Sequence, residues 1–163
     1  MKRYTLTQLM LVIALAGLLA FFTATPARAA ASSITQSYSS VTDDVACLEF
    51  SWVGSSVDGS VTATASTSEI DGWVFMAITN PGSPTPTASY NVYLYDSEGV
   101  DVMGGTLTAR SNSASEQAIP LIASDWYGER FVEGTITLTI TGQSVHSAEG
   151  VVKVYYYKYR KTY

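Results

Sequence analysis

The chain has 163 residues, of which 47% are hydrophobic and only 14% charged, with 12 Gly and 5 Pro. This composition predicts one globular domain and excludes a disordered or repetitive chain. The net charge is −5, which argues against a nucleic-acid partner, because binding to phosphate backbones needs clustered Lys and Arg.

The first 29 residues have the layout of a secretory signal peptide. Lys2 and Arg3 form a basic start, Leu9 to Phe22 is an apolar run, and the small-residue pattern Ala27-Arg28-Ala29 follows Pro26. We expect a signal helix removed after this pattern, or two residues later. The run is shorter than the roughly 20 apolar residues that a membrane helix needs. The protein is therefore expected to be secreted or periplasmic, without a membrane span; an uncleaved signal would leave it membrane-anchored.

All 14 acidic residues follow the signal, whereas three of the nine cations, Lys2, Arg3 and Arg28, belong to it, so the remaining chain carries a net charge of −8. Residues 30–43 are rich in Ser and Thr and predict a flexible lead. Residues 44–163 are expected to form the folded domain. Cys47 is the only cysteine, so no internal disulfide can form; a core or half-buried residue is expected there, and an intermolecular disulfide or a lipidation site is the alternative.

Short strands separated by turn residues fill the domain, and none of it shows helical periodicity. The clearest alternation of apolar and polar residues lies in 46–53 and 135–141, whereas the continuous apolar run 73–79 predicts a strand buried on both faces. Residues 90–95 and 100–103 are expected to form a hairpin. The predicted strands are 46–53, 61–66, 73–79, 90–95, 100–103, 106–110, 117–122, 135–141 and 151–159.

Eight or nine strands at this spacing predict an all-β fold, an antiparallel β-sandwich of jelly-roll or immunoglobulin-like type. Pro120 places the strand at 117–122 on a sheet edge.

No catalytic constellation and no cofactor motif is recognisable in the sequence. His146, the only histidine, lies in a predicted loop, and no G-x-S-x-G motif accompanies it. One His and one Cys are too few for the usual zinc ligands. We therefore expect a non-enzymatic protein, and a hydrolase that uses His146 is the competing hypothesis.

Three acidic residues surround a glycine in the segment 96–101. Asp96, Glu98 and Asp101 could supply oxygen ligands to calcium, but their spacing does not match an EF-hand loop. Asp-x-x-Gly sequences also form hairpin turns. The turn is the preferred interpretation and a weak calcium site the alternative.

Tyrosines crowd the C-terminal end. Consecutive strand residues point to opposite faces, so Tyr155 to Tyr157 cannot share one core, and some of these rings should be available for contacts with protein or sugar. The alternative is that the rings pack on the sheet and extend their hydroxyls to water. The candidate contact residues are Tyr155, Tyr157, Tyr159, Arg160 and Tyr163.

From Leu48 to about Val154 the chain resembles a family of small proteins encoded in tailed-phage and prophage genomes. The matching segments are Glu49-Phe50-Ser51-Trp52, Gly59-Ser60-Val61-Thr62-Ala63, Thr79-Asn80-Pro81-Gly82-Ser83-Pro84-Thr85-Pro86-Thr87, Tyr90-Asn91-Val92-Tyr93-Leu94-Tyr95-Asp96, Gly99-Val100-Asp101-Val102-Met103-Gly104-Gly105 and the strand at 135–142. The resemblance implies a β fold and a virion-associated or structural role without catalysis. Those proteins usually lack an export signal, which this chain has.

Residues 4–20 also resemble the start of type IV pilins. Arg3 stands where that family has the glycine of its processing site, and Gln8 stands where it has a glutamate. A pilin-like subunit is therefore one alternative, and a phage-derived virion or filament subunit is another. The leading prediction is an exported, non-catalytic β-sandwich for surface binding or assembly, with a protein, a cell-surface glycan or a second copy as its partner.

Overall fold

The computed structural model describes residues 30–66 and 70–158, which form eleven β-strands. The strands are β1 (Ser33–Ser40), β2 (Val45–Val53), β3 (Ala65–Ser66), β4 (Ile70–Pro81), β5 (Asn91–Tyr95), β6 (Glu116–Ala118), β7 (Leu121–Ala123), β8 (Trp126–Tyr127), β9 (Arg130–Gly134), β10 (Thr137–Thr141) and β11 (Glu149–Tyr157). Within these two ranges no helix is long and apolar enough to cross a membrane. The expected signal helix, residues 1–29, lies outside them.

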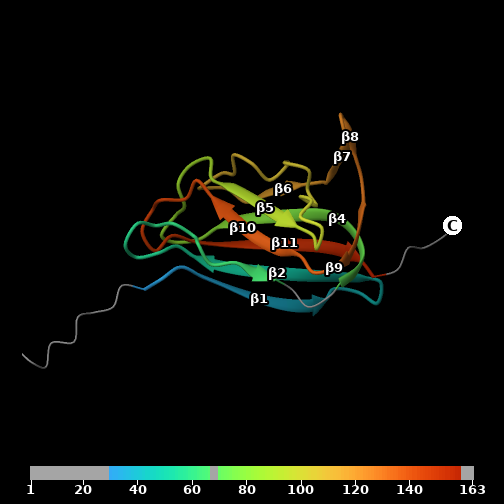
Figure 1. Ribbon diagram of the computed structural model, residues 1–163, viewed down its shortest axis with the longest axis horizontal. Helices are drawn as coiled ribbons and strands as arrows, with labels where there is room; N and C mark the ends of the chain where they lie inside the picture. Colours follow the sequence, from blue (N-terminus) through green and yellow to red (C-terminus); the bar gives the residue numbers. More distant parts are fainter. Residues whose placement is uncertain (1–29, 67–69, 159–163) are drawn as a thin grey trace, which may run out of the picture.

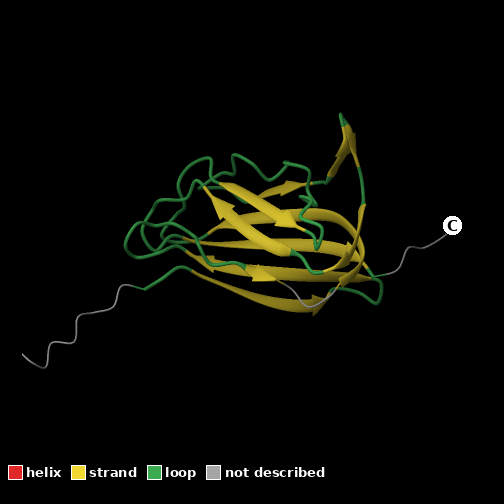
Figure 2. Cartoon of the chain, in the orientation of Figure 1, coloured by secondary structure: helices red, strands yellow, loops and turns green. Residues whose placement is uncertain are grey.

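The strands pair antiparallel in two principal sheets (Figures 1 and 2). Sheet A has the order β1-β2-β11-β4-β6, with β9 also paired to β4, and sheet B has the order β3-β10-β5. The strands β7 and β8 form a separate hairpin. The last strand, β11, thus lies in the middle of sheet A, between β2 and β4. The prediction of an all-β, antiparallel fold is confirmed.

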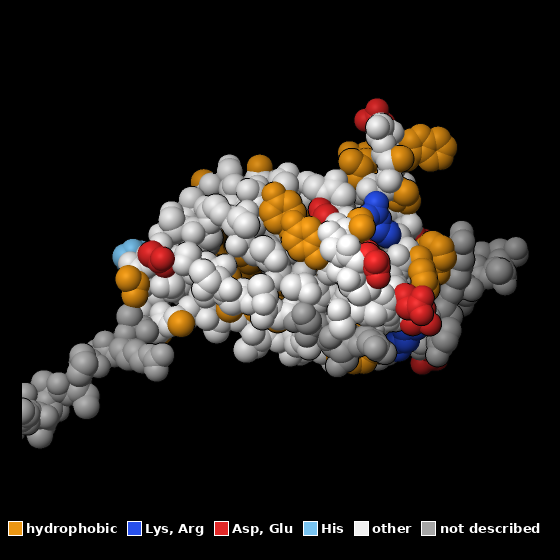
Figure 3. All heavy atoms as spheres, viewed as in Figure 1, with side chains coloured by type: hydrophobic (Ala, Val, Ile, Leu, Met, Phe, Trp, Pro, Cys, Tyr) orange, Lys and Arg blue, Asp and Glu red, His pale blue; other side chains and the backbone are white. Residues whose placement is uncertain are grey.

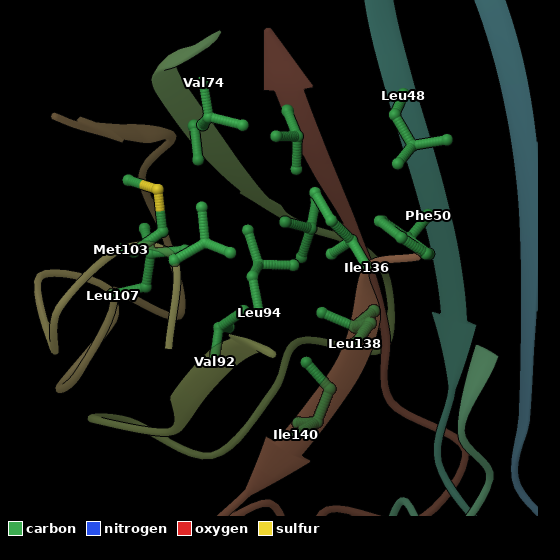
Figure 4. Packing of buried hydrophobic residues seen from close by; sticks show 14 of the residues in the cluster. Leu48, Phe50, Val74, Val92, Leu94, Met103, Leu107, Ile136, Leu138 and Ile140 are labelled. Carbon is green, nitrogen blue, oxygen red and sulfur yellow. The ribbon is translucent and has the colours of Figure 1, made fainter. Parts of the chain in front are cut away.

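One hydrophobic core receives side chains from both sheets (Figure 4). Alternation along each strand directs every second residue inward, and burying a large apolar side chain stabilises the fold by roughly 1.5–3 kcal/mol. Fully or almost fully buried side chains include Leu48, Phe50, Trp52, Val152 and Val154 from sheet A and Val92, Leu94, Leu138 and Ile140 from sheet B.

The segment 30–43 is not the flexible lead that its composition suggested. Its residues 33–40 form β1, which pairs with β2 over its whole length, from Ser33 opposite Val53 to Ser40 opposite Ala46. An edge strand needs little apolar surface of its own, because its ladder partner supplies the hydrogen bonds and only Ile34 packs against the core.

Residues 100–110 do not form the expected strands. Gly104 and Gly105 adopt positive φ values of 62° and 83°, which an extended strand does not accommodate. The segment instead turns beside β5 and still satisfies its backbone, since the amide of Val92 donates to the carbonyl of Leu107 at 2.9 Å and that of Val102 to Leu94 at 2.7 Å. Strands β8 and β9 were not predicted, and the expected strand at 61–66 shortens to β3.

A β-bulge in β4 changes the prediction for the apolar run 73–79. Tyr155 lies opposite Met76 and Tyr156 opposite Val74, so that Phe75 is the extra residue. The bulge puts Phe75 and Met76 next to each other, both half-buried, while Val74 and Ala77 are buried. The run was expected to be buried on both faces; the structure covers one face only.

Candidate functional site

The tyrosines of β11 separate onto the two faces of sheet A. Tyr156 points into the core and is only 5% exposed, whereas Tyr155 and Tyr157 lie on the outer face and are half-buried. The candidate residues Tyr159, Arg160 and Tyr163 lie outside the described residues.

Neighbouring strands add more aromatic rings to the same outer face. The ring of Phe75 stacks on Tyr157 with centroids 4.5 Å apart and an interplanar angle of 28°, and it meets Tyr155 at 6.4 Å and 44°. Trp73 and Phe131, which lie opposite each other on β4 and β9, have centroids 5.3 Å apart. We call these five residues the aromatic face. Of these five residues, only Tyr155 and Tyr157 were predicted as contact residues from the sequence.

The orientation of these rings limits what the aromatic face can bind. A flat sugar chain stacks best on rings that share one orientation, whereas the rings of Phe75 and Tyr157 are inclined to each other by 28°. The other pairs are tilted by 44° and 51°, so the cluster has no common plane. Such a surface suits apolar protein side chains better than a flat sugar chain.

Cys47 lies on the outer side of sheet A, opposite Tyr155 in the ladder, and is only 5% exposed. Burial raises the pKa of its thiol, an effect that the side chain of Tyr155 only partly offsets. Next along the face, Lys153 forms a 3.1 Å ion pair with Glu49, which raises the pKa of the lysine. The thiol therefore stays protonated and covered, as expected of a buried cysteine.

The hairpin β7–β8 carries the most exposed aromatic residues of the described ranges. Trp126 is 76% and Tyr127 63% exposed, and Ile122 of the paired strand is 49% exposed. Figures 1 and 3 show the hairpin projecting from the body with apolar side chains on it. We call this element the aromatic hairpin. The sequence predicted an edge strand at 117–122 and no strand at 126–127, so the hairpin was not predicted.

Sheet B presents a different outer surface. Tyr93 and Tyr95 point outward from β5, and their rings are nearly parallel, at 10°, with centroids 5.8 Å apart. Across the ladder, Thr139 lies opposite Tyr93 and Thr137 opposite Tyr95. Two parallel rings beside a row of hydroxyls resemble the chemistry that binds neutral sugars.

The candidate calcium ligands cap turns instead of converging. Asp96 accepts hydrogen bonds from the amides of Glu98 and Val100, at 3.0 and 2.8 Å. Asp101 accepts from the amides of Leu94, Met103 and Gly105, the last at 2.6 Å. No group of three metal-ligating side chains occurs in residues 30–66 and 70–158. The turn interpretation therefore accounts for both aspartates, and Glu98 is exposed.

His146 is exposed, in the loop between β10 and β11.

A buried polar cluster lies under the edge of sheet A. Arg110 is 7% exposed there, and its Nη2 lies 3.2 Å from Oε2 of Glu116. Its Nε donates to the hydroxyl of Thr79 at 3.1 Å. These contacts hold the loop 106–116 against β4 and give Arg110 a structural role.

No protein family matches the sequence, and no curated protein matches it. A chain described as "Cyanophage Pam1 capsid asymmetric unit" is similar in structure, with 15% sequence identity, a TM-score of 0.40, and coverage of 82% of this chain and 91% of that one. So low a TM-score does not establish a shared fold, and neither fold nor function is carried over from it.

Proposed function

We propose that this protein is an exported, non-catalytic β-sandwich that binds a protein partner through its aromatic hairpin. The observation that supports the proposal is the exposure of Trp126 and Tyr127, 76% and 63%, on an element that projects from the body. Trp and Tyr are the residues most often found at the energetic centre of protein interfaces.

Charge narrows the class of partner. Asp125 at the turn of the hairpin and Glu129 just after β8 are both exposed, and the chain beyond residue 29 carries a net charge of −8. An anionic lipid surface would repel such an element, whereas a protein surface with an apolar pocket and basic residues around it would complement it.

The test is photo-crosslinking in the cells that produce the protein, with the full-length gene. A benzophenone amino acid is placed at Trp126 and, as a control, at Val57, another exposed apolar residue (62%) in a distant loop. We expect a discrete protein adduct from position 126 only. The absence of an adduct there, or the same adducts from both positions, would contradict the proposal.

Export is tested by the mass of the purified protein. Cleavage after Ala29 would lower the mass by that of residues 1–29, whereas an uncleaved chain would keep the full mass.

A second candidate function is binding of a neutral glycan by sheet B, because Tyr93 and Tyr95 are parallel and flanked by threonines. Affinity electrophoresis in gels that contain soluble neutral polysaccharides measures it. Retardation should be lost in Tyr93→Ala and retained in Tyr155→Ala, which changes a ring on the opposite sheet. No retardation in any gel would eliminate this candidate.

A further inference from the structure

The edges of the two sheets are protected unequally. The unpaired edge of a strand offers a row of amide and carbonyl groups that can pair with another chain, and proteins usually block it with charges, prolines, very short strands or covering loops. Strand β6 has only three residues and is followed closely by Pro120, and β3 has two. The segment 100–110 covers β5 with backbone hydrogen bonds.

Strand β1 has neither the charges nor the prolines nor the shortness of the other edges. A loop contacts only its beginning, where the amides of Thr62 and Ala63 donate to the hydroxyl of Ser32 at 2.9 and 3.0 Å. The strand is eight residues long, its sequence SITQSYSS holds no charge and no proline, and no other described strand pairs with the side that faces away from β2. Seven of its eight residues are exposed. Figure 1 shows it along the border of sheet A.

We propose that β1 is the dimerisation edge of this protein and pairs antiparallel with β1 of a second copy, about a two-fold axis at Gln36. A continuous sheet requires residues directly opposite each other to share a face. Ile34, Gln36 and Tyr38 share the core side of β1, because their partners on β2 are Trp52, Phe50 and Leu48. With the axis at Gln36, Ile34 of each copy lies opposite Tyr38 of the other, and the two glutamine amides lie opposite each other.

The choice of this register rests on apolar contact. Tyr38 is 57% exposed although it is on the core side, and the isoleucine of a second copy would cover its ring. An axis at Ser37 would instead put Ile34 opposite Ser40 and Tyr38 opposite Gln36, which loses the apolar pair.

Charge does not oppose a second copy at this edge. The chain beyond residue 29 has a net charge of −8, so two copies repel each other over most of their surfaces. The eight uncharged residues of β1 are a place where two copies can meet without opposing like charges. The proposal is independent of the partner of the aromatic hairpin, which belongs to a different element.

Disulfide trapping tests the register with the protein expressed from its full-length gene. In a Cys47→Ala background, Gln36→Cys puts two cysteines directly opposite each other, within the Cα separation that a disulfide spans. Ser39→Cys is the matched control, because this exposed residue of the same strand would lie roughly 20 Å from its equivalent across the axis. Mild oxidation should give a covalent dimer with Gln36→Cys only. Equal dimer yields from both variants, or none from either, would overturn the proposal.

Light scattering over a wide concentration range provides the second measurement. The unmodified protein should become dimeric as concentration rises. Gln36→Lys should raise the dissociation constant about two- to fivefold, because two lysines would oppose each other on the axis. Gln117→Lys makes the same change at an exposed residue of β6 and should have no effect. A strict monomer, or equal weakening by both substitutions, would refute the dimer. The crosslinking result for Trp126 is unaffected by either outcome, so the two proposals fail separately.

Discussion

The indole of Trp52 lies directly against Gly150, its partner across the β2–β11 ladder. A Cβ atom added to Gly150 would lie 2.6 Å from Cε2 and Cζ2 of that ring. Both residues are buried, Trp52 with 1% of its surface exposed. The glycine is thus required by the space that the largest core side chain occupies.

Gly150→Ala should therefore destabilise the protein by about 1–3 kcal/mol, the usual cost of overpacking a core. Denaturant unfolding measures it. In a Trp52→Phe background the same substitution should cost clearly less, because the smaller ring vacates the space next to Gly150. Equal costs in both backgrounds would show that the contact with the indole is not the cause.

Ala109→Gly should stabilise the protein by about 0.5–1 kcal/mol. Ala109 is exposed with φ of +53°, a conformation that is unfavourable for an L-residue with a Cβ and accessible to glycine. Thermal unfolding is the measurement. Ala114→Gly is the control, because Ala114 is an exposed loop alanine without a positive φ value. It should be neutral or destabilising, and stabilisation by both substitutions would point to a general effect of glycine.

Glu116→Gln should destabilise the fold by about 1–3 kcal/mol, because the buried guanidinium of Arg110 would lose its counter-ion. This expected loss of stability is smaller than for a fully buried ion pair, because the side chain of Glu116 is 38% exposed. Glu49→Gln is the matched control: its pair with Lys153 is about one-third exposed on both sides and should contribute under about 1 kcal/mol. A larger loss from Glu49→Gln would contradict this ranking.

Stability should fall as the pH rises above 10. Burial raises the pKa of Tyr90 and of Tyr156 above the ordinary value of 10.0. As the pH rises, the two hydroxyls therefore lose their protons in the unfolded chain before they do so in the folded protein. The stability that the protonated tyrosines contribute is fully present below pH 10 and is lost as the pH rises toward their pKa values in the folded protein. The measurement is the denaturant midpoint of unfolding below and above pH 10. The difference between the two midpoints should be smaller in Tyr90→Phe than in the unmodified protein. The exposed-ring variant Tyr127→Phe should behave like the unmodified protein.

The sequence predicted those strands whose two faces differ. In β2 and β10 apolar and polar residues alternate because one face meets the core and the other meets water. The division of Tyr155 and Tyr156 between the two faces follows from the same period. These features depend on local pattern alone, and local pattern was sufficient.

The remaining elements depend on tertiary contacts that leave no local signal. Strand β1 exists because β2 supplies its hydrogen bonds, and its Ser-rich sequence reads as a loop. The bulge at Phe75 places consecutive residues on one face, which makes β4 read as a fully buried strand. The aromatic hairpin exposes large apolar residues, which a sequence pattern predicts to be buried. Trp126 was therefore not predicted as a contact residue.

The position of Cys47 gives the chain a built-in chemical reporter. It is the only thiol in the sequence, and it is covered on the outer side of sheet A, next to Tyr155. A thiol reagent can reach it only when that outer layer opens, so the rate of labelling in native conditions measures the free energy of this local opening. A partner seated over Tyr155 would slow the labelling, whereas one held by the distant hairpin would leave the rate unchanged.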